Sequence, residues 1–374
     1  MFRVLIVSFL LIPTILCGQK ISFSSEVKNS PNREIIQIRE FWESYIKDIS
    51  ISNSATRHNV FAKYWNKEEL DLGFTDIIND ELPVYSLGKL IVLSIDNKNN
   101  GYYNIKNKVV NNSNKEPGTT YAIFNICIKK ESSGYKLYNY FNLNKASLSH
   151  SRFGEIDYYY PKNFAFNSSK ATETADFYTK ISSIYSGNIK KNLTYIVANN
   201  FNEANNLIGF DQSIVTSSAP YAGFSIKNQG IILSCRIDHL HEIVHAVFFS
   251  RFPNTPALFN EGIATYYGGT GGFSLPSLIR QFKEFIKNDP VANLSDLNNL
   301  DQIKENGTNN FYILGALLID YTIKIGGPQK VINLFDYSTN KHLSSDDPWP
   351  AIEIELGIKK DQFDTFIKKY LESL

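Results

Sequence analysis

The segment from Ile237 to Phe249 limits what the chain can fold into more than any other part of the sequence. Its residues are nearly all apolar, which predicts a helix that is buried on most of its sides. Ionisable side chains are rarely buried without a partner or a ligand. The segment nevertheless carries five polar residues, namely Asp238, His239, His241, Glu242 and His245.

His241 and His245 are four positions apart, so on a helix both imidazoles project from one face, one turn from each other. Two ring nitrogens at this spacing can reach one ion at about 2.1 Å while the helix stays regular. The segment reads HEIVH, which is the HExxH motif, and predicts a zinc site. Glu242 lies beside the first ligand, where it can take a proton from water and later deliver it to a leaving amine. His239 points to another face and is expected to support the site or lie on the surface.

The segment from Asn260 to Tyr267 contains a candidate third ligand, Glu261. Its pattern is that of a short helix closed by Gly268 and Gly269, which can form a C-terminal cap. Glu261 follows His245 by 16 residues, which leaves room for the first helix to end, a loop and a return helix. The alternative is a surface carboxylate at the start of a helix, where the helix dipole favours it.

The HEIVH segment followed by a return helix with the sequence NEG resembles the gluzincin zinc metallopeptidases, the superfamily of thermolysin and the alanyl aminopeptidases. The spacing is closest to that of bacterial peptidase MA-like domains, in which a similar EGxA segment follows the motif helix. The resemblance covers roughly residues 156–374. It implies that His241, His245 and Glu261 hold one zinc ion and that Glu242 is the catalytic base.

Tyr312 belongs to a third matching segment. Residues 311–318 open an apolar helix that is expected to end at Gly326 and Gly327, with Pro328 starting the next helix. Aminopeptidase-type gluzincins have a similar Tyr-x-x-Gly helix, and the resemblance implies that Tyr312 donates a hydrogen bond to the oxyanion of the tetrahedral intermediate. The alternative is a core aromatic, because the chain is rich in tyrosine.

The resemblance implies hydrolysis of a peptide bond in a peptide or protein substrate. In gluzincins an edge strand beside the motif helix binds the substrate backbone, and residues 222–225 or 230–233 are the candidates here. No clamp for a free amine is apparent, which favours an endopeptidase over an exopeptidase. Two alternatives are a secreted protein that binds zinc without catalysis and a zinc hydrolase with a non-peptide substrate.

The order of the patterns predicts an α+β chain with two domains. Residues 19–150 are expected to form a small accessory domain, with a helix over 32–48 and a sheet that weakly resembles cystatin-like or NTF2-like folds. Residues 151–374 are expected to form the zincin metallopeptidase domain, with a mixed sheet and a helical C-terminal half. The strands predicted for the accessory domain cover residues 89–95, 102–110, 120–129 and 135–143.

The N-terminus has the pattern of a signal peptide. Basic Arg3 precedes an apolar run over residues 4–16 that is too short to span a bilayer comfortably, so residues 1–18 are predicted to direct export to the periplasm, the extracellular space or the cell surface. Cys17 leaves a lipid anchor open, but the residues before it lack the small side chain that such cleavage needs. No later stretch has the about 18 consecutive apolar residues of a membrane helix.

Charge and cysteine content restrict the partners and the covalent framework. The 38 basic and 37 acidic residues give a formal charge of +1, and no basic stripe interleaved with aromatics indicates nucleic-acid binding. A hydrophobic content of 43% excludes disorder of the whole chain. Cys127 and Cys235 form at most one bridge, or are two thiols. The oligomeric state does not follow from the sequence.

Overall fold

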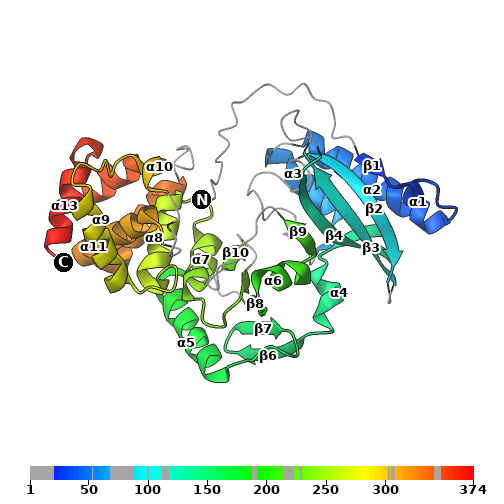
Figure 1. Cartoon of the computed structure of the whole chain (residues 1–374), viewed down its shortest axis with the longest axis horizontal. Coiled ribbons are helices and arrows are strands. Elements are labelled where there is room, and N and C mark those ends of the chain that lie inside the picture. The colour runs from blue at the N-terminus through cyan, green and yellow to red at the C-terminus, as the bar shows by residue number, and fades with distance from the viewer. Residues whose placement is uncertain are drawn as a thin grey trace. The chain divides into compact units, whose positions relative to one another are not determined.

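The computed structural model describes residues 21–52, 54–67, 88–98, 101–111, 118–187, 192–213, 223–226, 230–301, 304, 308–340 and 347–374. These residues form a mixture of helices and sheets, in agreement with the predicted α+β class (Figure 1). The predicted signal peptide, Cys17 included, lies outside the described residues. Within the described part, no helix has both the length and the apolar character needed to cross a bilayer.

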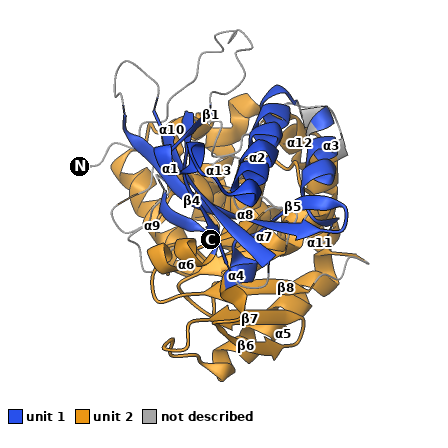
Figure 2. Cartoon of the chain, turned by 90° about the vertical axis from the view of Figure 1, so that its right-hand side faces the viewer, with its two compact units in different colours: residues 1–143, 208–215 blue, residues 144–207, 216–374 orange. Residues whose placement is uncertain are grey.

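The chain divides into two compact units (Figure 2). Unit 1 comprises Met1–Leu143 and Ile208–Val215, and unit 2 comprises Asn144–Leu207 and Thr216–Leu374. The predicted boundary at residue 150 differs from this division in two places, because strand pairing assigns residues 149–153 to the sheet of unit 2 and residues 210–213 to the sheet of unit 1.

The described residues of unit 1 form a six-stranded sheet in the order β1-β2-β3-β4-β5, with β9 also paired to β4. The pairs are antiparallel except for the parallel pair of β1 and β2. The strands are β1 (Ile21–Phe23), β2 (Lys89–Asn97), β3 (Tyr102–Val110), β4 (Thr120–Glu131), β5 (Gly134–Tyr138) and β9 (Phe210–Ser213). The helices are α1 (Ser25–Lys28), α2 (Arg33–Ile51), α3 (Ser54–Tyr64) and α4 (Phe141–Lys145), in which the first part of the unit ends.

Helix α2 confirms the amphipathic helix predicted near residues 32–48. Asn32 caps it, since its Oδ1 accepts a hydrogen bond from the backbone N–H of Glu34 at 2.8 Å. The indole Nε1 of Trp42 donates to Oδ1 of Asn107 on β3 at 3.1 Å, which ties the helix to the sheet. The buried side of α2 consists of Ile38, Trp42, Tyr45, Ile46 and Ile49.

The strand predicted over residues 135–143 is wrong beyond Tyr138, where β5 ends. The backbone N–H of Asn142 bonds to the carbonyl of Asn139, and that of Leu143 bonds to the carbonyl of Tyr140. These local backbone bonds begin α4, and asparagine is a residue favoured in turns. The other three strands predicted for this sheet are confirmed as β2, β3 and β4.

Unit 2 contains a five-stranded mixed sheet in the order β10-β11-β8-β7-β6. The two inner pairs, β11 with β8 and β8 with β7, are parallel, and the outer pairs are antiparallel. Of the described strands, β10 and β6 therefore form the edges of this sheet. The strands are β6 (Ser149–Phe153), β7 (Ile156–Tyr160), β8 (Leu193–Val197), β10 (Gly223–Ile226) and β11 (Ile231–Ser234).

The helices of unit 2 follow mainly after the sheet, as Figure 1 shows in yellow to red. Helix α11 breaks at Gly327, where φ is +65° and Pro328 follows, which confirms the predicted end of the apolar helix. The helical segments are α5 (Ser168–Tyr185), α6 (Phe201–Leu207), α7 (Leu240–Arg251), α8 (Ala257–Gly268), α9 (Leu275–Asn288), α10 (Leu297–Leu300), α11 (Asn310–Asn340), α12 (Trp349–Ala351), η5 (Ile352–Leu356), η6 (Lys360–Gln362) and α13 (Phe363–Glu372).

Two glycines allow α8 and α11 to cross at very short range. A Cβ atom on Gly262 would lie 2.5 Å from the carbonyl carbon of Gly315, and one on Gly315 would lie 2.3 Å from the carbonyl oxygen of Leu258. Both distances are far below an ordinary van der Waals contact, so only glycine fits at either position. These are the glycines of the NEG and Tyr-x-x-Gly segments, and they bring the helices that carry Glu261 and Tyr312 together.

Candidate metal centre

The HExxH segment forms the first part of α7, whose side chains from His241 to Phe249 are all buried. His241 and Glu242 are each 7% exposed and His245 is 4% exposed. The two imidazole rings meet edge to face with their centroids 4.7 Å apart, as expected for positions separated by one helical turn. The helix thus presents two imidazoles side by side inside the protein.

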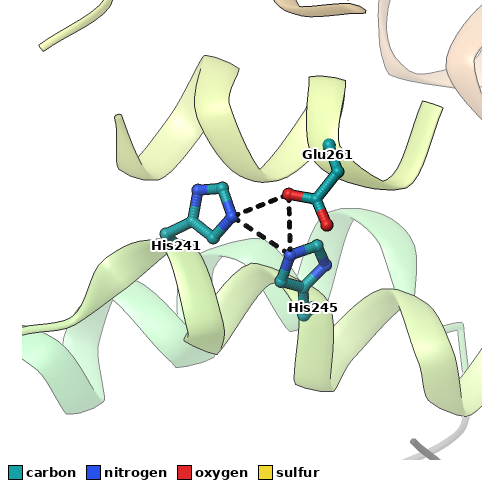
Figure 3. Close-up of side chains that lie close together, drawn as sticks. All are labelled: His241, His245 and Glu261. Carbon is teal, nitrogen blue, oxygen red and sulfur yellow. Dashed lines mark hydrogen bonds and ion pairs between the residues drawn. The ribbon is translucent and has the colours of Figure 1, made fainter. Parts of the chain in front are cut away.

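Glu261 on α8 completes a cluster of three potential ligands (Figure 3). His241 Nε2 lies 3.1 Å from His245 Nε2 and 3.2 Å from Glu261 Oε2. His245 Nε2 lies 3.5 Å from the same Glu261 oxygen. Ligand atoms at about 2.1 Å around a tetrahedral zinc ion are about 3.4 Å apart, so the three atoms have the separation that this metal requires.

The hydrogen bond at Nδ1 of His241 determines whether Nε2, the nitrogen that faces the cluster, carries a hydrogen or a lone pair. Nδ1 lies 2.7 Å from the carbonyl oxygen of Gly269, so Nδ1 carries the hydrogen and donates it. In the neutral ring, Nε2 then presents a lone pair to the Glu261 carboxylate and to His245. Electron pairs that converge in a buried site repel one another unless a cation lies between them, and the donor set therefore suits a metal ion.

The pKa shifts of Glu261 and His241 also indicate that the cluster favours positive charge. Burial raises the pKa of Glu261, but the imidazoles of His245 and His241 outweigh burial and leave this pKa well below its usual range. Burial lowers the pKa of His241, but Glu261, Glu242 and the Gly269 carbonyl together raise it above its usual value. The site therefore stabilises a carboxylate anion and favours positive charge beside it.

The end of α8 orients the first ligand. A Cβ atom on Gly268 would lie 2.3 Å from the backbone nitrogen of His241, so this glycine lets α8 end directly against the first turn of α7. Gly269, with φ at +72°, follows the helix, and its carbonyl reaches His241 Nδ1. The sequence predicted a helix cap at these glycines but not their contact with His241, because that contact depends on how two helices pack.

Tyr312 lies next to the cluster on α11. Its ring stacks on the imidazole of His241, with the centroids 6.1 Å apart and the planes 20° from parallel. The negative charge of Glu261 raises the pKa of Tyr312 well above its usual value, and burial adds to this effect. The phenol is therefore a protonated hydrogen-bond donor beside two of the three potential ligands.

Glu242 is buried beside the cluster but does not belong to the three-residue ligand group. Its Oε1 lies 3.9 Å from Nε2 of His239, which occupies the N-cap position of α7. Burial lowers the pKa of His239 to about 4, although Glu242 opposes the shift, so this imidazole is neutral near pH 7. The sequence placed His239 on a different face from the two ligand histidines, and its contact is with Glu242.

Only one of the two segments considered for strand addition has a free edge among the described strands. β11 is paired on both sides, to β10 and to β8, whereas the pairing of β10 among the described residues is to β11 alone. β10 also packs against α7, the helix that carries the two histidines. The described edge beside the metal cluster is therefore Gly223–Ile226, and the segment over 230–233 is an inner strand.

No protein-family model and no curated protein matches the sequence. Among solved structures, an M1 zinc metallopeptidase variant from Deinococcus radiodurans bound to a Tyr-Ser-Ala substrate matches with a TM-score of 0.38, 14% identity and 76% coverage of this chain. The M1 zinc metallopeptidase from the same organism matches with a TM-score of 0.36, 13% identity and the same coverage. This chain spans 62% and 63% of those two chains. A likeness at this level does not assign a family.

Proposed function

We propose that the chain is an exported zinc metallopeptidase of the gluzincin type that hydrolyses peptide bonds in its substrate. The convergence of His241 Nε2, His245 Nε2 and Glu261 Oε2 to separations of 3.1 to 3.5 Å carries the proposal. Imidazole and carboxylate are ligands that zinc accepts, and three protein ligands leave a position open, as in catalytic rather than structural zinc sites. The cluster found among the described residues has three members, which supports catalysis over a purely structural metal.

Each residue around the cluster has a role in this proposal. When bound, zinc supplies a Lewis acid that polarises a carbonyl and lowers the pKa of water to about 7. Glu242 accepts the proton of the attacking water and delivers it to the leaving amine. Tyr312, which Glu261 keeps protonated, donates to the substrate oxygen on which negative charge develops. The edge of β10 binds an extended peptide through backbone hydrogen bonds.

Zinc stoichiometry and peptidase activity of the wild type and Glu242→Gln test the proposal. We expect one zinc ion in both proteins and a loss of activity of about 10²- to 10⁴-fold in the variant, the usual contribution of a general base. Glu353→Gln serves as a control, since Glu353 is exposed on η5. Full activity in zinc-loaded Glu242→Gln would contradict the assignment. Parallel assays on ester and glycopeptide substrates separate a peptidase from another zinc hydrolase.

Export is the part of the proposal that depends on residues 1–18. The basic start, the apolar run and the polar continuation support cleavage by a signal peptidase. N-terminal sequencing and mass spectrometry of the protein recovered from a secreting host test it. A mature N-terminus near residue 19 is expected, a lipid mass on Cys17 would show an anchored protein instead, and retention of residues 1–18 would contradict export.

A further inference from the structure

The imidazole of His239 lies beside Glu242, the proposed base, but has no role in the proposed function. His239 occupies the N-cap position of α7, and its side chain is 14% exposed. One ring nitrogen, Nδ1, lies 2.9 Å from Oγ of Ser234 at the end of β11. The other, Nε2, lies 3.9 Å from Oε1 of Glu242. The ring is therefore hydrogen-bonded to the sheet at Nδ1 and faces Glu242 with Nε2.

Residues of β10 and β8 also surround His239. A Cβ atom on Gly223 of β10 would lie 2.4 Å from His239 Nδ1, so the absence of a side chain at residue 223 makes room for the imidazole. The backbone N–H of His239 donates to the hydroxyl of Tyr195 at 3.2 Å, and that hydroxyl donates to the carbonyl of Arg236 at 2.7 Å. Backbone and ring are thus both held in place.

The carboxylate of Glu242 favours one tautomer of His239. A lone pair on Nε2 would face the negative Oε1 and be repelled, whereas an N–H at Nε2 is attracted to it. With the hydrogen on Nε2, Nδ1 is an acceptor and Ser234 donates to it. The Ser234 oxygen in turn accepts from the backbone N–H of Arg236 at 3.1 Å. Donors and acceptors then match from Arg236 through Ser234 to His239, whose Nε2–H faces Glu242 Oε1 at 3.9 Å, beyond hydrogen-bond distance.

We propose that His239 is a positioning residue, which directs its Nε2–H at Oε1 of Glu242 and leaves the second carboxylate oxygen free to accept the proton of the attacking water. The proposal deepens the proposed function, and its catalytic part rests on it. Supporting groups of this kind change activity by about 10- to 100-fold when they are removed. The substrate and the metal do not contact His239 in this role, so its loss lowers turnover and leaves substrate binding and metal content nearly unchanged.

The kinetic test compares His239→Phe, which keeps a ring without a donor, with His239→Gln, which keeps a donor. We expect kcat to fall about 10- to 100-fold in His239→Phe, with KM and zinc stoichiometry close to those of the wild type, and to recover in part in His239→Gln. His150→Phe is the matched control, since His150 lies exposed on β6. Wild-type kcat in folded, zinc-loaded His239→Phe would overturn the proposal, and so would equal losses in both variants.

A second measurement does not depend on activity. Long-range ¹H–¹⁵N NMR spectra of the full-length protein report which ring nitrogen of His239 carries the hydrogen. We expect the Nε2–H tautomer in the wild type and a mixture of tautomers in Ser234→Ala, which removes one hydroxyl and no ring. A predominant Nδ1–H tautomer in the wild type would overturn the proposal. A wild type without peptidase activity overturns the proposed function instead, and the spectra tell the two failures apart.

Discussion

Replacing Gly315 by alanine should separate α8 from α11 and damage the metal centre more than the fold. The new Cβ would lie 2.3 Å from the carbonyl oxygen of Leu258 and 2.8 Å from Cα of Gly262. Relief of these contacts requires α8 to move by about 1 Å, and such overpacking costs about 1–3 kcal/mol. Alanine has a higher helix propensity than glycine, but this stabilises the helix by at most about 1 kcal/mol, so the free energy of unfolding should fall.

The same displacement is large on the scale of the site. α8 carries Glu261, and metal–ligand distances tolerate a deviation of only about 0.2 Å. α11 carries Tyr312, and a misplacement of about 1 Å in a catalytic group can reduce the rate about 100-fold. We therefore expect Gly315→Ala to bind zinc more weakly and to lose about two orders of magnitude in kcat/KM, while remaining folded.

Three assays on Gly315→Ala check this reasoning. Urea denaturation of the metal-free protein gives the loss of stability, competition with a chelator gives the zinc affinity, and peptide hydrolysis gives kcat/KM. Ile325→Ala is the control on the same helix, because Ile325 is 47% exposed and its truncation leaves the contact with α8 intact. Wild-type zinc affinity and activity in Gly315→Ala would refute the argument that the two glycines set the geometry of the site.

Two further variants test the surroundings of the cluster. Tyr312→Phe should keep zinc and lose about 10²- to 10³-fold in kcat, as expected for one oxyanion donor, and an unchanged kcat would leave Tyr312 as a packing residue. Burial raises the pKa of Asp238, but hydrogen bonds from Arg236 and Lys170 outweigh it and lower the pKa from 3.8 to about 2. This stabilisation is present above pH 3.8 and is lost as the pH falls toward 2. Because solvent screens this partly exposed ion pair, Asp238→Asn should lower the free energy of unfolding by at most about 1 kcal/mol at pH 7 and change it little at pH 2. Urea denaturation at both pH values measures the difference.

Residues related by helical geometry could be placed from the sequence. The spacing of His241 and His245 suffices to put two imidazoles on one face, because a helix has a fixed period. The break at Gly327 was also predictable, since a glycine with positive φ followed by proline ends a helix for local reasons. The approach of Glu261 to the two histidines was a prediction from a motif, and the structure places its carboxylate within 3.2 and 3.5 Å of their nitrogens.

Contacts that arise from tertiary packing were not predictable from one sequence. The hydrogen bond from His241 to the Gly269 carbonyl depends on how α8 ends against α7. The hydrogen bond between the ring of His239 and Ser234 forms only because β11 ends beside α7. The end of β5 at Tyr138 was missed because residues 139–143 are apolar enough for a strand, whereas local backbone hydrogen bonds start a helix there.

Strand β9 makes the two units inseparable by a single cut in the chain. The polypeptide passes between the units after residues 143, 207 and 215. A fragment that begins at residue 144 would carry Phe210–Ser213 without the strand it pairs with, and the complementary fragment would leave Ala122 to Phe124 of β4 with an open edge. Such edges promote aggregation. Fragments of this protein made by proteolysis or by recombinant expression should therefore contain both units on one polypeptide.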